Sequence, residues 1–355
     1  MKSVLLVAAC SLVALATGKE IDFDDDDITD DMFDIDDEND IDIEKQTRRY
    51  GLITPEDVNF TIYSRDNCTA PVFLNDTPAQ CFDPLRPTKI LIHGFLAKGK
   101  TFNKMKDAYL RTGDYNVIVA DWSQVASCWH SSKLSALVKM CYIAIVKSHL
   151  EGVSGLVASL IGKLARVGQD AQNMHLVGHS LGAHVAGQAS QRAGVDRYLG
   201  RITGLDPASP LLKSKNLTKV LDEKDAEFVD VIHTNVNYLG WKKPLGTADF
   251  YPYDGKGQPG CSFPSNVFQK CSHSKSHKYF TQTILDAWAF VAVPCGVLRE
   301  YDREKCHGTD VIYMGENVPL SARGSYYVTA AFSPCLKSSL VVVSAGLVSL
   351  SLMML

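Results

Sequence analysis

Residues 178–182 read Gly-His-Ser-Leu-Gly and place Ser180 at a change of sequence pattern. The preceding residues 174–177 are apolar and predict a short buried strand, and residues 181–187 predict the start of a helix. Between a strand and a helix, G-x-S-x-G forms a sharp turn that exposes the serine hydroxyl, because glycines without Cβ let the two backbones approach. The motif alone is common, and a buried turn serine is the alternative. With both flanking patterns present, we predict that Ser180 is a nucleophile.

Further short apolar runs bounded by turn residues predict buried parallel strands. These runs are residues 89–93, 116–120, 201–205 and 228–232, with helical patterns at 101–111 and at 134–167, the latter broken near Gly152. Strand and helix alternate along the chain, which indicates an α/β class. Together with the turn predicted at Ser180, this favours an α/β-hydrolase fold, with a mostly parallel central sheet flanked by helices.

A serine nucleophile needs a carboxylate and then a histidine, which follow it in this order in α/β-hydrolases. Asp206 stands at the end of the predicted strand 201–205, where open α/β sheets gather their sites. Asp196 lies in a polar turn and Asp230 in mid-strand, while Asp222 and Asp249 are further rivals. We select Asp206; a helix-capping aspartate is the alternative.

For the base we select His273, two residues after Cys271, because a disulfide from Cys271 to Cys261 would fix the loop that presents it. His233 closes a strand and is expected to be structural, His277 falls in a predicted helix, and His307 lies in a glycine-containing loop. His179 and His184 flank Ser180, but we expect the turn to point them away from its hydroxyl, as packing groups.

The tetrahedral intermediate of acyl transfer also needs hydrogen-bond donors for its oxyanion. One is the backbone N–H of the residue after the nucleophile, Leu181. The other comes from the turn that ends the strand 89–93, which makes the N–H of Phe95 the second donor. An ordinary strand-ending turn is the alternative for Phe95.

The N-terminus predicts passage through the secretory route. Residues 1–18 contain Lys2, an apolar run and a small-residue cleavage site, as in a signal peptide. Four N-x-S/T sequons, at Asn59, Asn67, Asn75 and Asn216, agree with this route.

Residues 19–49 form an acidic segment that ends in a dibasic sequence, and we interpret them as a propeptide; a retained acidic tail is the alternative. Residues 19–44 hold 15 acidic residues and one basic residue, so self-repulsion disfavours folding. Residues 1–49 carry 15 of 40 acids and 5 of 36 bases, and without them 25 acids and 31 bases remain, a formal charge of +6 instead of −4. Such a basic protein is attracted to an anionic lipid surface.

Nine of the ten cysteines follow the signal peptide, and a secreted chain oxidises them. Cys261 with Cys271, and Cys295 with Cys306, are local and are paired here. Cys68, Cys81, Cys128 and Cys141 allow three connectivities, which stay open, and Cys335 is left over.

At this point the chain resembles the pancreatic-type neutral lipases, over about residues 52–334. The residues that carry the resemblance are Ile92-His93-Gly94-Phe95, Asp121-Trp122, residues 178–184, residues 204–208, residues 231–234, residues 249–252, Pro259-Gly260-Cys261 and Cys271-Ser272-His273. The resemblance implies the triad Ser180, Asp206 and His273, the oxyanion donors Phe95 and Leu181, and no metal or organic cofactor. The pancreatic lipases themselves also carry a C-terminal β-sandwich, and we expect this chain to have none.

In this family a disulfide-closed lid and a second loop cover the serine. Here the resemblance implies a short lid between Cys261 and Cys271, with Phe263, Val267 and Phe268 as its apolar face, and a short loop at 235–248. Both short loops are similar to those of secreted phospholipases A1, including the wasp-venom type, which cleave the sn-1 acyl ester of glycerophospholipids. A triacylglycerol or galactolipid lipase is the alternative, and a non-catalytic lipid-binding or yolk-type protein is a further one.

We take residues 50–335 as the lipase domain and residues 336–355 as a hydrophobic tail. Residues 340–355 are uncharged and as a helix would reach about 24 Å, short of a bilayer core of roughly 30 Å. Small residues and a spacer precede them, a layout that resembles a GPI-anchor signal; a retained tail or simple secretion are the alternatives. We expect a monomer that acts at a phospholipid or other lipid surface, without nucleic acid and without a colipase-type protein.

Overall fold

Short apolar strands build the centre of the protein. The computed structural model describes residues 53–74, 80–126, 142–210, 212, 220–236, 238–262, 270–295, 306 and 310–328. All of these lie in one compact unit, Thr29–Ala330. The strands are β1 (Asn59–Tyr63), β2 (Thr69–Pro71), β3 (Thr88–Ile92), β4 (Asn116–Asp121), β5 (Met174–His179), β6 (Arg201–Leu205), β7 (Phe228–Ile232), β8 (Ala248–Pro252), β9 (Val291–Pro294), β10 (Ile312–Tyr313, only two residues) and β11 (Gly324–Val328).

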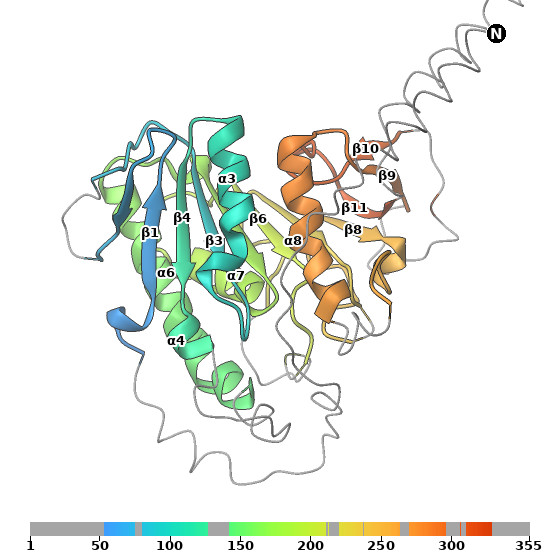
Figure 1. Ribbon diagram of the computed structural model, residues 1–355, viewed down its shortest axis with the longest axis horizontal. Coiled ribbons are helices and arrows are strands. Elements are labelled where there is room, and N and C mark those ends of the chain that lie inside the picture. Colours follow the sequence, from blue (N-terminus) through green and yellow to red (C-terminus); the bar gives the residue numbers. More distant parts are fainter. Residues whose placement is uncertain are drawn as a thin grey trace, which may run out of the picture. The chain divides into compact units, whose positions relative to one another are not determined.

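The described strands form one sheet in the order β10-β9-β11-β8-β7-β6-β5-β3-β4-β1-β2 (Figure 1). The run from β11 to β4 is parallel, while β1 and β2 at one edge and β9 and β10 at the other pair antiparallel. In the described ranges, every strand belongs to this sheet. The predicted mostly parallel α/β sheet is confirmed.

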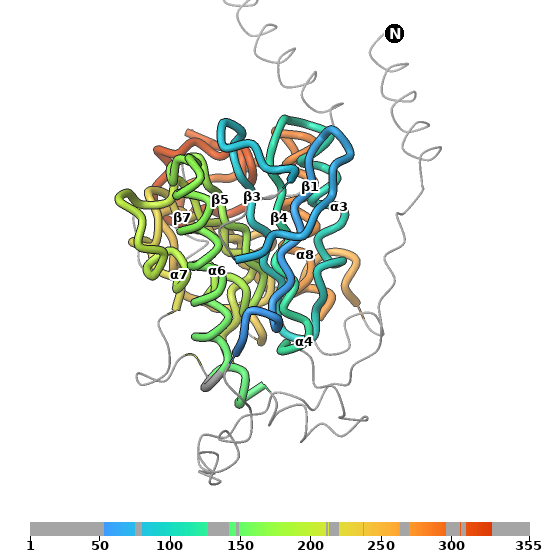
Figure 2. The backbone as a smooth tube through the Cα atoms, turned by 90° about the vertical axis from the view of Figure 1, so that its left-hand side faces the viewer, coloured from blue at the N-terminus to red at the C-terminus, as the bar shows by residue number. Residues whose placement is uncertain are grey.

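Helices cover both faces of the sheet (Figure 2). The α-helices are α3 (Asn103–Thr112), α4 (Ser123–Ala126), α6 (Leu150–Arg166), α7 (Leu181–Arg192) and α8 (Lys270–Leu285). Short turns are the 3-10 segments η2 (Pro55–Asp57), η3 (Gly99–Phe102), η5 (Ala171–Asn173) and η6 (Tyr253–Gly255), and the π-helical turn η4 (Ile145–His149). The side chains of α6 and α7 pack on one face, and those of α3 and α8 pack on the other.

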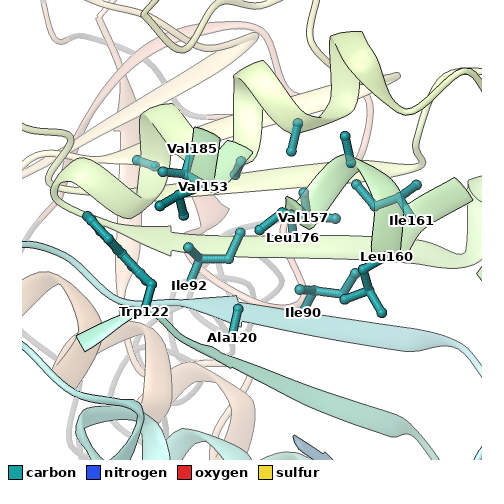
Figure 3. Close-up of a cluster of buried hydrophobic side chains, with 14 of the residues drawn as sticks. Ile90, Ile92, Ala120, Trp122, Val153, Val157, Leu160, Ile161, Leu176 and Val185 are labelled. Atoms are coloured by element: carbon teal, nitrogen blue, oxygen red, sulfur yellow. The ribbon is translucent and has the colours of Figure 1, made fainter. Parts of the chain in front are cut away.

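Both faces of the sheet are apolar because its central strands carry apolar residues at successive positions. Successive side chains of a strand point to opposite faces of the sheet. On β3, Ile90 and Ile92 pack with the α6 and α7 side, as Figure 3 shows, while Leu91 packs with the α3 and α8 side. Leu176 and Val177 of β5 divide in the same way. Each of these five side chains is fully buried, which stabilises the fold by about 1.5–3 kcal/mol per side chain.

Residues 134–167 were expected to form a helix broken near Gly152. Residues 134–141 lie outside the described residues, and a break at Gly152 itself is wrong. Helix α6 runs through Gly152 without interruption, and the irregular turn is η4, which precedes it. A Cβ at Gly152 would lie 2.7 Å from the Ile53 side chain, so the glycine admits a close neighbour rather than ending the helix.

Three disulfide bonds occur in the described residues. Cys261–Cys271 and Cys295–Cys306 are the two local pairs expected from the sequence, and Cys68–Cys81 selects one of the three open connectivities. Cys128, Cys141 and Cys335 lie outside the described residues, as do residues 1–52 and the tail 336–355. No helix within the described ranges has the length and apolar character that a membrane span needs.

A buried ion pair joins β6 to β7. Arg201 Nε and Nη2 donate to the two carboxylate oxygens of Asp230, at 2.8 and 3.0 Å. The same guanidinium donates to the carbonyls of Gly315 (2.9 Å) and Glu316 (2.6 Å). Burial acts to lower the pKa of Arg201, but the carboxylates of Asp230 and Glu316 outweigh it and raise this pKa. The pair therefore holds the segment before β11 against the sheet.

Lys89 and His175 extend this network across β3 and β5. Lys89 Nζ donates to Glu316 Oε1 (2.6 Å) and to His175 Nδ1 (3.1 Å). His175 Nε2–H donates to Thr203 Oγ1 (2.8 Å), whose hydroxyl donates to Asp230 Oδ1 (2.8 Å). This order requires a neutral imidazole, and burial together with the nearby cations lowers the pKa of His175 well below its ordinary value.

His184, on α7, is fully buried and makes two hydrogen bonds that require its neutral form. Its Nε2–H donates to the Ala208 carbonyl (2.8 Å), and its Nδ1 accepts from the Leu221 N–H (3.1 Å). Burial lowers the pKa of His184 from the ordinary 6.5 to about 4. Between these values the unfolded chain binds a proton that the folded chain does not, so this stability is complete above about pH 6.5 and is lost as the pH falls toward 4.

We therefore expect His184→Gln to lose less stability on acidification than the wild type. From pH 6.5 to pH 5 the difference should be about 2 kcal/mol, at 1.36 kcal/mol per pH unit for one proton. Urea unfolding at the two pH values measures it, with the amide of glutamine replacing the Nε2–H donor. Equal losses in both proteins would contradict this titration of His184.

Candidate active site

Ser180 occupies a tight turn between β5, which ends at His179, and α7, which begins at Leu181. Its φ of 56° and ψ of −122° are unusual for a residue with a side chain, and its N–H donates to the Leu205 carbonyl at 3.0 Å. A Cβ on Gly182 would lie 2.2 Å from the Ile92 carbonyl oxygen, so only glycine lets α7 start this close to β3. The structure thus contains the predicted strand–turn–helix at Ser180.

Asp206 follows β6 directly and has no solvent-exposed surface. Its Oδ1 accepts from the N–H groups of Thr234 (2.8 Å) and Asn235 (3.0 Å), and its Oδ2 lies 2.6 Å from His273 Nδ1. Two backbone donors and one imidazole therefore fix the carboxylate in a single orientation.

His273 lies in the first turn of α8, not in a loop as expected. The Cys261–Cys271 bond joins the start of this helix to the segment after η6, as a disulfide placed there was expected to hold His273. Because a carboxylate accepts, Nδ1 of His273 carries the proton that is donated to Asp206. The other ring nitrogen, Nε2, makes no hydrogen bond to the described residues.

His273 lies beside His179, the residue that precedes Ser180. The rings of His179 and His273 lie 4.6 Å apart, and both Ser180 and His273 are at least nine-tenths buried. The hydrogen bonds among the described residues include Asp206–His273 but none between Ser180 Oγ and His273. In enzymes without substrate such contacts are often long and tighten when substrate binds.

His179 is a packing group as expected, but its partner is His273. His179 Nε2–H donates to the carbonyl of His273 (3.2 Å), and the centroid of the His179 ring lies 5.2 Å from that of the His277 ring. Burial, followed by the neighbouring imidazoles, lowers the pKa of His179 well below its ordinary value. A neutral His179 therefore supports the α8 turn that carries His273 without adding charge beside it.

The turn after β3 lies beside the Ser180 hydroxyl. A Cβ on Gly94 would lie 3.2 Å from Ser180 Oγ, which places the Gly94–Phe95 peptide next to the serine. Within the described residues, no backbone carbonyl accepts from the N–H of Phe95 or from that of Leu181. Neither predicted oxyanion donor therefore has a backbone acceptor in the part of the chain that the structure describes, and their role as donors stays a prediction.

Gly240 packs directly over the carboxylate of Asp206. A Cβ at this position would lie 2.3 Å from Asp206 Oδ1, so alanine must push the carboxylate away from His273. We expect Gly240→Ala to lower kcat by about 10²-fold, since misplacement by about 1 Å costs that much. The matched control is Gly257→Ala, whose Cβ meets nothing within 4 Å. Equal activity of the two variants would contradict this role of Gly240.

The remaining candidates lie elsewhere. His233 is structural as expected, since its Nδ1 contacts the Trp241 carbonyl and its Nε2 contacts Asp249 Oδ1, both at 2.8 Å.

Of the predicted glycosylation sites, Asn59 begins β1 and Asn67 occupies a turn with a positive φ, and both are exposed. Outside the described residues lie Asn75, Asn216, the lid residues Phe263, Val267 and Phe268, and His307. Among the described side chains, no group of three His, Cys, Asp or Glu residues is placed to hold a metal ion.

A family model and several known proteins match most of the chain. The family model described as Lipase matches residues 40–320. Lipase member H of Oryctolagus cuniculus is 34% identical over 71% of this chain and 54% of its own length, so the chain spans about half of that relative. Phospholipase A1 of Vespa crabro is 33% identical over 78% of this chain and 90% of its own, and phospholipase A1 2 of Vespa affinis is 36% identical over 67% and 71%. The chain forms an α/β sheet with a serine turn, and the family model matches most of the chain's length. The chain therefore belongs to the Lipase family.

Proposed function

We propose that this protein is an extracellular phospholipase A1 that hydrolyses the sn-1 acyl ester of glycerophospholipids with Ser180, His273 and Asp206. The observation that carries the proposal is the Asp206–His273 hydrogen bond of 2.6 Å beside the Ser180 turn. The likeness to proteins named phospholipase A1 supports the substrate class.

The proposed reaction assigns one role to each of these residues. His273 Nε2 takes the hydroxyl proton as Ser180 Oγ attacks the ester carbonyl, while Asp206 holds the Nδ1 proton and stabilises the imidazolium. The N–H groups of Phe95 and Leu181 stabilise the oxyanion. The tetrahedral intermediate expels the lysophospholipid alkoxide, which takes the proton from His273. Water, deprotonated in the same way, then releases the fatty acid from the acyl-serine.

The loop 235–248 supports a phospholipid substrate. It is short, and it is tied to the segment after Asp206, since Ser209 N–H donates to the Leu239 carbonyl (2.8 Å) and Trp241 N–H to the Pro207 carbonyl (2.7 Å). We expect a short loop held in this way to leave space at the site for a polar headgroup. Triacylglycerol or galactolipid hydrolysis is the second candidate, because the match to the Lipase family model does not by itself distinguish one lipid ester from another.

Purified protein incubated with phosphatidylcholine, triolein or a galactolipid separates these activities. Phosphatidylcholine with different acyl chains at sn-1 and sn-2 shows which ester is cleaved, and we expect release of the sn-1 acid. Preferred release from triolein or galactolipid would contradict the phospholipase assignment, and release from none of them would favour a lipid-binding protein.

The same proposal covers the partners and the location. The enzyme acts as a monomer on a phospholipid surface, without metal, nucleic acid or a colipase-type protein. Three disulfide bonds among the described residues support an oxidising, extracellular compartment. Attachment through a GPI anchor at the tail is part of the proposal. Release of activity from cells by a phosphatidylinositol-specific phospholipase C tests it, and activity that stays on the cells counts against it.

A further inference from the structure

The Gly94–Phe95 peptide next to Ser180 has its carbonyl held by a side chain. His93 Nδ1 lies 2.9 Å from the Gly94 carbonyl oxygen, which also accepts from the Ala97 N–H at 3.3 Å. A carbonyl can only accept, so Nδ1 of His93 carries a proton and donates it. Because a trans peptide is planar, its C=O and N–H point in opposite directions, and fixing the Gly94 carbonyl also fixes the direction of the Phe95 N–H.

The His93 ring is itself held firmly. It has no exposed surface and stacks on Trp122 with ring centroids 5.4 Å apart, and Trp122 Nε1–H donates to the His93 carbonyl (2.7 Å). On the far side of the ring, Nε2 lies 3.0 Å from the Trp122 N–H and 3.1 Å from Asp121 Oδ1. A neutral ring accepts from Trp122, and a charged ring donates to Asp121. In both states Nδ1 keeps its proton, so the bond to Gly94 persists.

We infer that His93 is a positioning residue that aims the Phe95 N–H at the oxyanion through the Nδ1–H···O=C bond to Gly94. The inference rests on the proposed function, because it concerns the oxyanion site of that reaction. The oxyanion exists only after attack, so a misdirected Phe95 N–H weakens transition-state binding and leaves substrate binding unchanged. A purely structural histidine would affect folding and not the kinetic constants of the folded enzyme.

The two ring nitrogens can be tested separately. In His93→Asn the side-chain NH₂ lies near the position of Nδ1 and can still donate to Gly94, while in His93→Gln it lies near Nε2 and faces Asp121 and Trp122. We expect His93→Gln to lower kcat by about 10²-fold with KM within about twofold, and His93→Asn to recover most of that loss. The rates on a short-chain ester are divided by the concentration of active sites titrated with a phosphonate, so unfolded protein does not affect kcat.

Equal kcat values for the two variants, or a loss only in His93→Asn, would overturn the inference. A second measurement does not depend on the variants folding. In wild-type protein labelled with ¹⁵N-histidine, NMR should show His93 Nδ1 protonated throughout the pH range of activity, and an unprotonated Nδ1 would also overturn it. If the wild-type protein hydrolyses no ester, the proposed function itself is rejected. If the wild type is active and the His93 variants have the same kcat as the wild type, only the role of His93 is rejected.

Discussion

Ser180→Ala is expected to lower ester hydrolysis by about 10⁴-fold or more, because His273 then has no hydroxyl to deprotonate. Alanine keeps the Cβ, so the turn at φ 56° is no more strained than in the wild type. The fold should persist, with unchanged circular dichroism and unfolding midpoint. Fatty-acid release from phosphatidylcholine, measured per folded molecule, gives the ratio of the two activities.

The matched control is Ser159→Ala on the exposed side of α6, where the hydroxyl only donates to the Gly155 carbonyl of its own helix. We expect its activity to equal that of the wild type. Substantial hydrolysis by Ser180→Ala would remove Ser180 as the nucleophile. A loss shared by both variants would indicate a damaged fold instead.

Asp230→Ala should destabilise the fold by about 3–5 kcal/mol, because it leaves the buried Arg201 guanidinium without its carboxylate. Asp230 is fully buried and Arg201 nearly so, and Thr203 loses the acceptor of its hydroxyl in the same variant. Urea unfolding at pH 7.5 measures the change. Activity per folded molecule should persist, since Arg201 starts β6 while Asp206 follows its other end.

An exposed ion pair provides the comparison. Asp66 pairs with Arg86 at 3.3 Å, but the Asp66 side chain is 72% exposed, so Asp66→Ala should cost about 1 kcal/mol or less. Replacing both buried partners, Arg201→Met with Asp230→Leu, should recover much of the stability, because neither charge is then left unpaired. If Asp230→Ala costs no more than Asp66→Ala, the buried pair does not anchor the segment before β11.

The five central strands β3 to β7 could be predicted because their signals are local, whereas β1, β2 and β8 to β11 were not predicted. The apolar runs at 89–93, 116–120, 201–205 and 228–232 each became a strand within one residue of the expected ends. The turn at Ser180 was equally local, since its two glycines and the flanking patterns lie within a few residues. The break expected near Gly152 was wrong because its cause is not local. The neighbour of Gly152 is Ile53, about a hundred positions away in sequence, and only that contact explains a glycine within a continuous helix.

The sequence by itself determined the five central strands, the Ser180 turn and the hypothesis that Asp206 and His273 act with Ser180, because each depends on residue types at short spacing or on chain order. Only the tertiary structure decided which groups meet: His179 against His273, His93 against the Gly94 carbonyl, and Lys89, His175, Arg201, Asp230 and Glu316 in one buried network. The physical reason is that hydrogen bonds and ion pairs act over a few ångströms, and folding brings together groups from strands that are far apart in the chain.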